Sequence, residues 1–152
     1  MNYIKHETFE SALRSTWQLV SKMYNKEALK FDSTMATGFA LLSIDAEGTP
    51  STNLGPKMGM ESTSLSRLLK VMEKRELIKR IKNPNDGRWV LIHLTPFGKR
   101  HRENSKAVVL DFNEEIDKQL SRQQVQSFFE VIEFIIETTS NFEHFNKTVT
   151  QK

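Results

Sequence analysis

Apolar residues recur every three or four positions in the first third of the chain, a period that predicts amphipathic helices. Residues 7–29 carry one such stripe and are predicted to form the first helix. A second helix should begin after a polar cap and run to the turn-forming segment 45–48. Three residues offer the side-chain oxygen that such a cap needs: Asp32, Ser33 and Thr34.

Two further helices are predicted in close succession. Pro50 opens a short helix over residues 53–58, which Gly59 stops, and Pro56 is tolerated there only within about the first turn. After a tight turn, residues 62–75 form an amphipathic helix whose inward face carries Leu65, Leu68, Leu69 and Met72. The outward face is polar and basic: Ser62, Thr63, Ser64, Ser66, Arg67, Lys70 and Lys74.

The period of the pattern then changes, and two strands and two long helices complete the chain. Residues 78–82 and 89–94 are predicted strands, joined across the turn-forming segment 83–87 into a hairpin with a basic first strand. Thr95 caps a long helix with proline at its first position, and Ser121 opens a capping box that begins the last helix. The predicted fold class is therefore mainly α with a small β-hairpin wing (α+β).

The formal net charge of +3 conceals an uneven distribution of charge. Residues 53–106 carry thirteen basic and five acidic side chains, a local charge of +8, whereas the two flanks together carry −5. A basic centre between acidic ends indicates a surface that binds a polyanion, although a solvated charged face has the same signature. The order of elements has to decide between them.

Several classes of chemistry are excluded by what the sequence lacks. It contains no cysteine, which rules out disulfides and thiolate catalysis, and no zinc spacing, phosphate-binding glycine loop or serine-nucleophile elbow. We therefore expect no metal, no cofactor and no enzymatic activity. The N-terminus has no apolar stretch of signal-peptide length, so we expect a cytoplasmic protein with no membrane partner. The four histidines are scattered: His6, His93, His101 and His144.

A short helix, a tight turn and a polar-faced helix together predict a helix-turn-helix, whose second helix fits the major groove of double-stranded DNA. Arg67 can make a paired hydrogen bond to guanine, and Lys70 and Lys74 can reach phosphates. At the tip of the hairpin, Arg88 can enter the minor groove while Asp86 holds the loop or the Arg88 side chain. The predicted DNA-binding residues are Ser62, Thr63, Ser64, Ser66, Arg67, Lys70, Lys74, Asp86 and Arg88.

These residues carry a resemblance to a known family. Residues 86–88, Asp-Gly-Arg, followed by Leu94, Thr95 and Gly98, resemble the wing signature of the multiple-antibiotic-resistance regulator (MarR) family. Residues 62–78 are similar to the family's recognition helix and the entry to its first wing strand. The resemblance implies an obligate, triangular homodimer with one winged helix-turn-helix per subunit on a pseudo-palindromic operator. It also implies that a small, often aromatic anion in a crevice between the dimer and DNA-binding regions can release the DNA.

The sequence departs from the family pattern in two places. Glu76 stands where glycine is usual, so the turn after the recognition helix either avoids a left-handed conformation or tolerates its cost. Residues 54–56, Leu-Gly-Pro, replace a helix-forming Leu-Ala pair, so the first helix of the motif is expected to be short or irregular.

The predicted organisation is a single unit, 1–152, with a winged helix-turn-helix over 32–95 and dimerisation helices over 1–30 and 96–146. The apolar residues predicted at the dimer interface are Phe9, Leu13, Phe128, Ile132, Ile135, Ile136 and Phe142. Packing of these helices within one subunit is the alternative. The candidates for an effector pocket are Trp17 and Trp89. Two other functions stay open: a winged module that binds an acidic protein partner, and a helical protein that binds small molecules.

Overall fold

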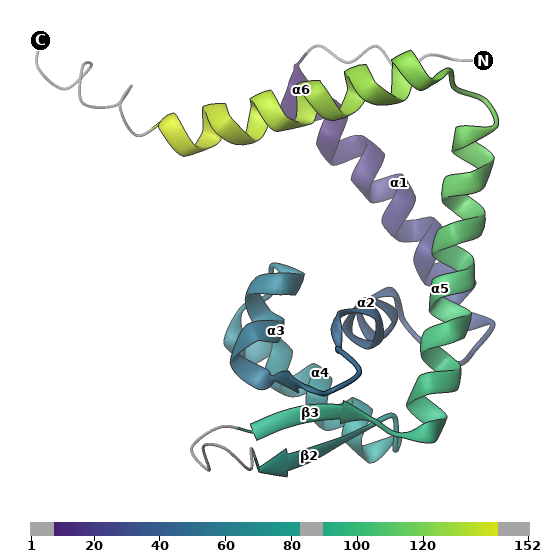
Figure 1. The fold of residues 1–152 in the computed structure, drawn as a ribbon, viewed down its shortest axis with the longest axis vertical. Coiled ribbons are helices and arrows are strands. Elements are labelled where there is room, and N and C mark those ends of the chain that lie inside the picture. Colours follow the sequence, from purple (N-terminus) through teal and green to yellow (C-terminus); the bar gives the residue numbers. More distant parts are fainter. Residues whose placement is uncertain (1–7, 83–89, 143–152) are drawn as a thin grey trace, which may run out of the picture. The chain divides into compact units, whose positions relative to one another are not determined.

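The computed structural model describes residues 8–82 and 90–142 of the chain. These residues form α1 (Phe9–Leu29), α2 (Met35–Ser43), β1 (Thr49–Pro50), α3 (Ser51–Met58), α4 (Ser62–Lys74), β2 (Ile78–Lys82), β3 (Val90–Leu94), α5 (Pro96–Asp117) and α6 (Arg122–Asn141) (Figure 1). The predicted order of helices and hairpin strands is confirmed, and so is the mainly helical fold class. The chain divides into two compact units, Met1–Val109 and Leu110–Lys152.

The predicted caps explain where three of the helices begin. The Oγ1 atom of Thr34 accepts a hydrogen bond of 3.1 Å from the N–H of Thr37 at the start of α2. Thr95 caps α5 in the same way, with 2.9 Å between its Oγ1 and the N–H of Gly98. At α6, Ser121 and Gln124 form the reciprocal capping box, at 3.2 and 2.9 Å. Each cap satisfies a backbone donor that the first turn of a helix leaves free.

The structure corrects the prediction for α3. This helix begins at Ser51, two residues earlier than expected, and Pro56 is therefore its sixth residue, beyond the first turn. The expectation that Pro56 needs the first turn was wrong. Because the helix has only eight residues, the missing proline N–H removes one of few intrahelical hydrogen bonds, and the helix ends two residues later at Met58.

The three strands form one antiparallel sheet in the order β1-β3-β2. In the hairpin, Ile78 pairs with Leu94 and Lys82 pairs with Val90. Thr49 of β1 pairs with Ile92 on the other edge of β3, which attaches the segment before α3 to the hairpin. The sequence did not predict β1, because two residues are too few to show an alternating pattern.

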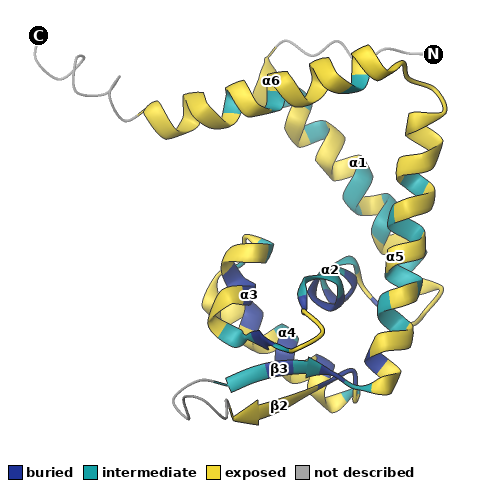
Figure 2. Ribbon diagram, viewed as in Figure 1, coloured by how far each residue is buried: buried dark blue, intermediate teal, exposed yellow. Residues whose placement is uncertain are grey.

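The core of the first unit lies where α2, α3, α4 and the sheet meet (Figure 2). Its buried apolar residues are Ala40, Leu41, Ile44, Leu54, Leu65, Leu69, Met72, Leu77, Ile78, Ile92 and Leu94. No residue of α1 is buried. The core therefore belongs mainly to the predicted winged helix-turn-helix, and it determines which side of α4 faces outward.

The second unit has no buried residue among those described, and α6 is mostly exposed in Figure 2. This unit begins with the last part of α5. Lys118, directly after that helix, pairs with both Glu114 and Glu115 at 2.9 Å. Its exposed apolar residues include Leu110, Phe128, Phe129, Val131, Phe134, Ile136 and Phe142. Within the ranges that the structure describes, no helix combines the length and the apolar character needed to span a bilayer.

Candidate nucleic-acid interface

A tight turn joins α3 to α4, and its backbone geometry depends on Gly59. This residue has a left-handed conformation, with φ 60° and ψ 34°, in which a Cβ atom is unfavourable. The N–H of Met60 then donates to the carbonyl of Gly55 at 3.0 Å, which closes the end of α3. The two helices thus form the predicted helix-turn-helix, and α4 follows its partner after three residues.

Core packing fixes the rotation of α4. Leu65, Leu69 and Met72 lie at spacings of four and three and are buried against the core, as predicted. All seven side chains predicted on the opposite face are exposed: Ser62, Thr63, Ser64, Ser66, Arg67, Lys70 and Lys74. The burial of one face therefore presents the other to solvent as a polar, basic surface.

The cations of this surface have no counter-ions within the described part of the chain. Arg67, Lys70 and Lys74 lie at spacings of three and four, so they follow one stripe of the helix. None of them forms an ion pair with a described residue. Three exposed positive charges along one stripe can neutralise phosphates or donate to base edges.

The first turn of α4 offers backbone donors beside the hydroxyl groups. No side chain among the described residues caps this helix at Glu61, and the first intrahelical bond is donated by the N–H of Leu65 to the carbonyl of Glu61. The N–H groups of the three residues before Leu65 thus point out of the helix end. Together with the hydroxyl groups of Ser62 and Thr63, they can donate to phosphate oxygens.

Other basic residues of the central segment have structural partners. Arg75 donates to Asp32, the Nε of Arg80 lies 3.1 Å from Glu73 Oε2, and the Nζ of Lys57 lies 2.9 Å from Asp45 Oδ2. Hydrogen bonds from Lys57 and Thr49 hold the pKa of Asp45 below its ordinary value. The local charge of +8 therefore overstates the surface that is free to bind a polyanion.

One exposed residue of the α4 surface was missed by the sequence analysis. Val71 is 53% exposed and lies four residues after Arg67 and three before Lys74. An apolar side chain there can contact the methyl group of thymine. Its only signal in the sequence is an apolar residue outside the inward stripe of the helix.

The hairpin next to α4 carries further exposed cations on its first strand. Lys79 and Lys82 of β2 are exposed and form no ion pair with a described residue. The tip of the hairpin, with the predicted site residues Asp86 and Arg88, lies outside the described residues, as does Trp89. The role predicted for Arg88 in the minor groove therefore stays a prediction.

The turn after α4 has the left-handed backbone conformation, which was one of the two possibilities that the sequence left open for Glu76. Glu76 has a φ of 56°, and the N–H of Leu77 donates to the carbonyl of Met72 at 2.9 Å, which is how a glycine normally ends a helix. Thr95 then donates from its Oγ1 to the carbonyl of Glu76 at 2.5 Å. The start of α5 is thereby attached to the residue that ends the candidate recognition helix.

We expect Glu76→Gly to raise the free energy of unfolding by about 0.5–1 kcal/mol, because glycine removes the cost of a left-handed Cβ but adds entropy to the unfolded chain. Urea denaturation measures the change. Glu76→Ala is the matched control, since it removes the carboxylate and keeps the Cβ. Equal stabilisation by both variants would mean that the carboxylate, and not the backbone conformation, is responsible.

Residues of α2 line two hollows in the first unit. A groove of about 530 Å³ is lined by Trp17, Met35, Phe39, Lys57 and Met58, among others. Trp17 is 52% exposed and stacks on Phe39, with 6.3 Å between the ring centroids. The predicted effector residue Trp17 therefore lies in a groove that offers aromatic rings and one cation.

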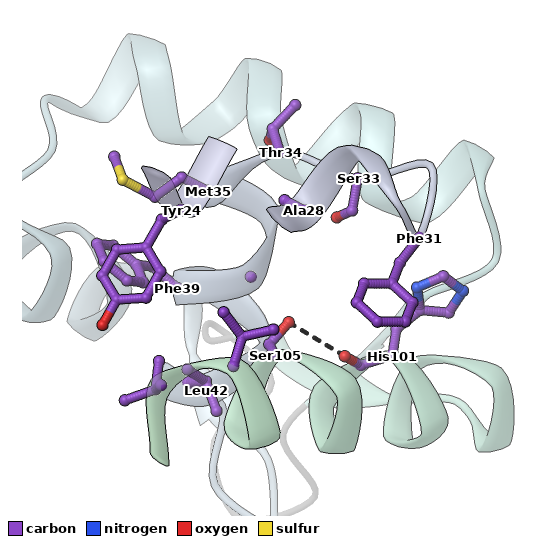
Figure 3. Close-up of a pocket in the computed structure, with 13 residues that line it drawn as sticks. Tyr24, Ala28, Phe31, Ser33, Thr34, Met35, Phe39, Leu42, His101 and Ser105 are labelled. Atoms are coloured by element: carbon purple, nitrogen blue, oxygen red, sulfur yellow. Dashed lines mark hydrogen bonds between the residues drawn. The ribbon is translucent and has the colours of Figure 1, made fainter. Parts of the chain in front are cut away.

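The second hollow is a small cavity between α1, α2 and α5 (Figure 3). It measures about 30 Å³, which is room for about one water molecule and too little for an aromatic ring. Ser33 and His101 line it, and the buried Oγ of Ser33 has no hydrogen-bond partner among the described residues. Burial lowers the pKa of His101, and the positive charges of Arg75 and Arg100 lower it further. The nearby Asp32 carboxylate raises this pKa but only partly offsets the decrease.

This shift predicts how stability depends on pH. Because folding lowers the pKa of His101, the unfolded chain binds a proton more readily, and the free energy of unfolding should fall as the pH drops through about 6.5. Thermal unfolding at several pH values between 8 and 5.5 should give a smaller loss of Tm for His101→Gln than for the wild-type chain. Equal losses in both proteins would rule out His101 as a source of the dependence.

The seven residues predicted at a dimer interface are divided between the two units. In the first unit, Phe9 and Leu13 of α1 are exposed. In the second, Phe128, Ile136 and Phe142 are exposed, and Ile132 and Ile135 are half-buried. None of the seven is in the buried class within its own unit.

Comparison with known proteins gives matches in both sequence and fold. The family model described as the MarR family matches residues 34–90. The chain is 30% identical over 115 residues to the HTH-type transcriptional regulator SarZ of Staphylococcus saprophyticus, a match that covers 72% of this chain and 79% of SarZ.

Solved structures share the fold. The S. aureus MepR–DNA complex aligns with a TM-score of 0.79 at 18% identity, over 88% of this chain and 99% of MepR. A mutant of E. coli MarR complexed with operator DNA aligns with a TM-score of 0.72 at 24% identity, over 82% of this chain and 90% of that protein. This chain therefore shares its fold with proteins that were crystallised with DNA.

Proposed function

The chain belongs to the MarR family of transcriptional regulators, and we propose from this that it is a repressor that binds a pseudo-palindromic operator as a homodimer. Its activity would be binding without catalysis, in the cytoplasm. The segment 32–95 would bind the DNA, and the helices within 1–30 and 96–146 would hold the two subunits together.

One observation carries the DNA-binding proposal: the basic stripe of α4 has no counter-ions among the described residues. Arg67, Lys70 and Lys74 are exposed while Leu65, Leu69 and Met72 anchor the other side of the same helix. An anchored helix that presents unpaired cations and hydroxyl groups has the chemistry that the major groove requires. We propose that Ser62, Thr63, Ser64 and Ser66 approach the phosphates and base edges there, and that Asp86 and Arg88 act at the minor groove.

Selection of bound duplexes from a random pool, followed by fluorescence anisotropy with the enriched sequence, tests this function. We expect enrichment of a sequence with two related half-sites and a steep decrease of affinity with salt, by about 0.9 in the log–log slope for each phosphate contact. A pool without any enriched sequence would contradict the proposal.

An acidic protein partner is the second candidate, and the same basic stripe favours it. It predicts binding to acidic polypeptides and an equal, weak affinity for all duplexes, so the selection separates the two functions. A helical protein that binds only small molecules would show no affinity for DNA at all.

The homodimer is supported by apolar surface that the single chain leaves uncovered. Phe9, Phe128 and Ile136 are each more than half exposed. Sedimentation at micromolar concentration should give twice the mass of one chain, and Phe128→Asp should shift the equilibrium toward monomer. A stable wild-type monomer would contradict the proposed interface.

Release by a small aromatic anion is supported by the groove that contains Trp17. Trp17 and Phe39 offer ring faces, and Lys57 offers a positive charge, although it also forms an ion pair with Asp45. Benzoate, with neutral benzyl alcohol as control, should quench tryptophan fluorescence and lower DNA affinity, and Trp17→Leu should abolish the effect on affinity. Equal effects of both compounds would exclude recognition of the charge.

A further inference from the structure

Among the described residues, the two that are not glycine and have a left-handed backbone lie at the ends of two helices. Asp32, with φ 50°, follows α1, and Glu76, with φ 56°, follows α4. Both helices end with the same hydrogen-bond pattern, from Ser33 to Ala28 at 3.0 Å and from Leu77 to Met72 at 2.9 Å. Glycine would fit both positions more easily, and aspartate also tolerates this backbone while adding a carboxylate at Asp32.

A contact from Arg75 to Asp32 connects these two helix ends. The Nη2 atom of Arg75, which precedes Glu76, donates to the backbone carbonyl of Asp32 and to its Oδ2 atom at 3.2 Å. The side chain of Arg75 is 29% exposed and that of Asp32 is fully exposed, so the contact lies at the surface with the arginine as its more buried partner. A glycine in place of Asp32 would keep the carbonyl acceptor and lose the carboxylate.

The contact lies between the small cavity and the candidate recognition helix. Phe31 and Ser33, on either side of Asp32, line the cavity together with His101 (Figure 3). On the other side, Arg75 continues α4 directly after Lys74, the last residue of its basic stripe. A displacement of the segment between α1 and α2 would therefore act on the end of α4 through Arg75.

We propose that Arg75 is a positioning residue for DNA binding, which sets the orientation of α4 through its contact with Asp32 and does not itself touch DNA. This inference rests on the proposed function. Removing one side of the contact should leave the protein folded, because Leu69 and Met72 still anchor α4 in the core. It should change how well the basic stripe fits the groove.

The experiment measures the affinity of the selected duplex and of a scrambled duplex over a range of salt concentrations, at a temperature well below unfolding. We expect Arg75→Gln and Asp32→Asn each to lose about fivefold in affinity for the selected duplex, with an unchanged salt slope and little change for the scrambled one. The double variant should lose no more than Arg75→Gln alone, since Arg75→Gln already removes the donor of both hydrogen bonds. Lys30→Gln is the matched control, because it removes a nearby charge that pairs with Glu27 and does not contact α4.

The outcomes separate this inference from the function on which it rests. If the wild-type chain enriches no duplex, the proposed function fails and this inference fails with it. If the wild-type chain binds its duplex and both variants bind equally well, only the positioning role is wrong. A smaller salt slope for Arg75→Gln, without any effect of Asp32→Asn, would show that Arg75 contacts phosphate directly. Because Asp32→Asn retains the carbonyl acceptor and a residue suited to left-handed backbone, it provides the measurement if Arg75→Gln does not fold.

Discussion

Gly98→Ala should destabilise the protein by about 3 kcal/mol or more, at the upper end of the cost of overpacking, although alanine normally stabilises a helix. A Cβ atom at Gly98 would lie 1.9 Å from the carbonyl oxygen of Leu77, a distance that no pair of heavy atoms tolerates without movement. Leu77 cannot readily move. It is fully buried, its N–H donates to Met72, and its carbonyl accepts a 3.1 Å hydrogen bond from the N–H of Thr95.

Gly38→Ala is the matched control for this prediction. Gly38 is also a buried residue of a helix, but its added Cβ would meet the Oγ of Ser105 at 3.1 Å, and a side chain can rotate away. We expect Gly38→Ala to change the free energy of unfolding by less than about 1 kcal/mol and Gly98→Ala to lower the Tm clearly. Thermal unfolding of the two variants decides the point, and a Gly98→Ala protein as stable as the wild-type chain would contradict it.

The signature that contains Gly98 was readable from the sequence, but the reason for the glycine was not. The resemblance marked Thr95 and Gly98 as a pattern, whereas the structure explains it: the first turn of α5 packs directly on the backbone that ends α4. Hydrophobic periodicity does not reveal the close approach of two backbones. In the sequence, only the presence of glycine at position 98 indicates it.

Local chemistry explains why most element boundaries could be predicted. A hydroxyl group at Thr34, Thr95 or Ser121 satisfies donors within the next three residues, so each helix start depends on a few neighbours. By the same logic, α3 was placed too late, since the residue before it is Pro50, which has no capping side chain. The strand β1 was missed because its partner in β3 lies more than forty residues away.

The sequence predicted which side chains of the candidate site are exposed, but it could not predict which basic side chains form ion pairs. The alternation of apolar and polar positions placed Arg67 and Lys70 outward and Leu69 inward, as the structure confirms. It could not distinguish these cations from Arg75, whose partner Asp32 is 43 positions away. Charge counts treat every basic residue alike, whereas the fold engages some of them in ion pairs and leaves others exposed.

The second large effect is expected from Arg67→Ala. Arg67 lies near the middle of the exposed stripe of α4, and a guanidinium that donates two parallel hydrogen bonds to one guanine contributes about 1–3 kcal/mol to discrimination between bases. The preference of the protein for its selected duplex over a scrambled one should therefore fall by about 10- to 100-fold, because 1.4 kcal/mol corresponds to tenfold. Anisotropy titrations with both duplexes at the same salt concentration measure it.

Lys70→Gln is the comparison that separates reading of the sequence from attraction to the backbone. Lys70 lies on the same stripe, three residues further along, and its flexible ammonium group suits a phosphate better than a base edge. Its loss should weaken binding to both duplexes about equally and reduce the salt slope by about 0.9 for each phosphate contact. If Arg67→Ala behaves in this same way, Arg67 contacts phosphate, and the bases must be read by other residues of the stripe. If neither variant changes binding, α4 does not lie in the groove, and the basic stripe has a different partner.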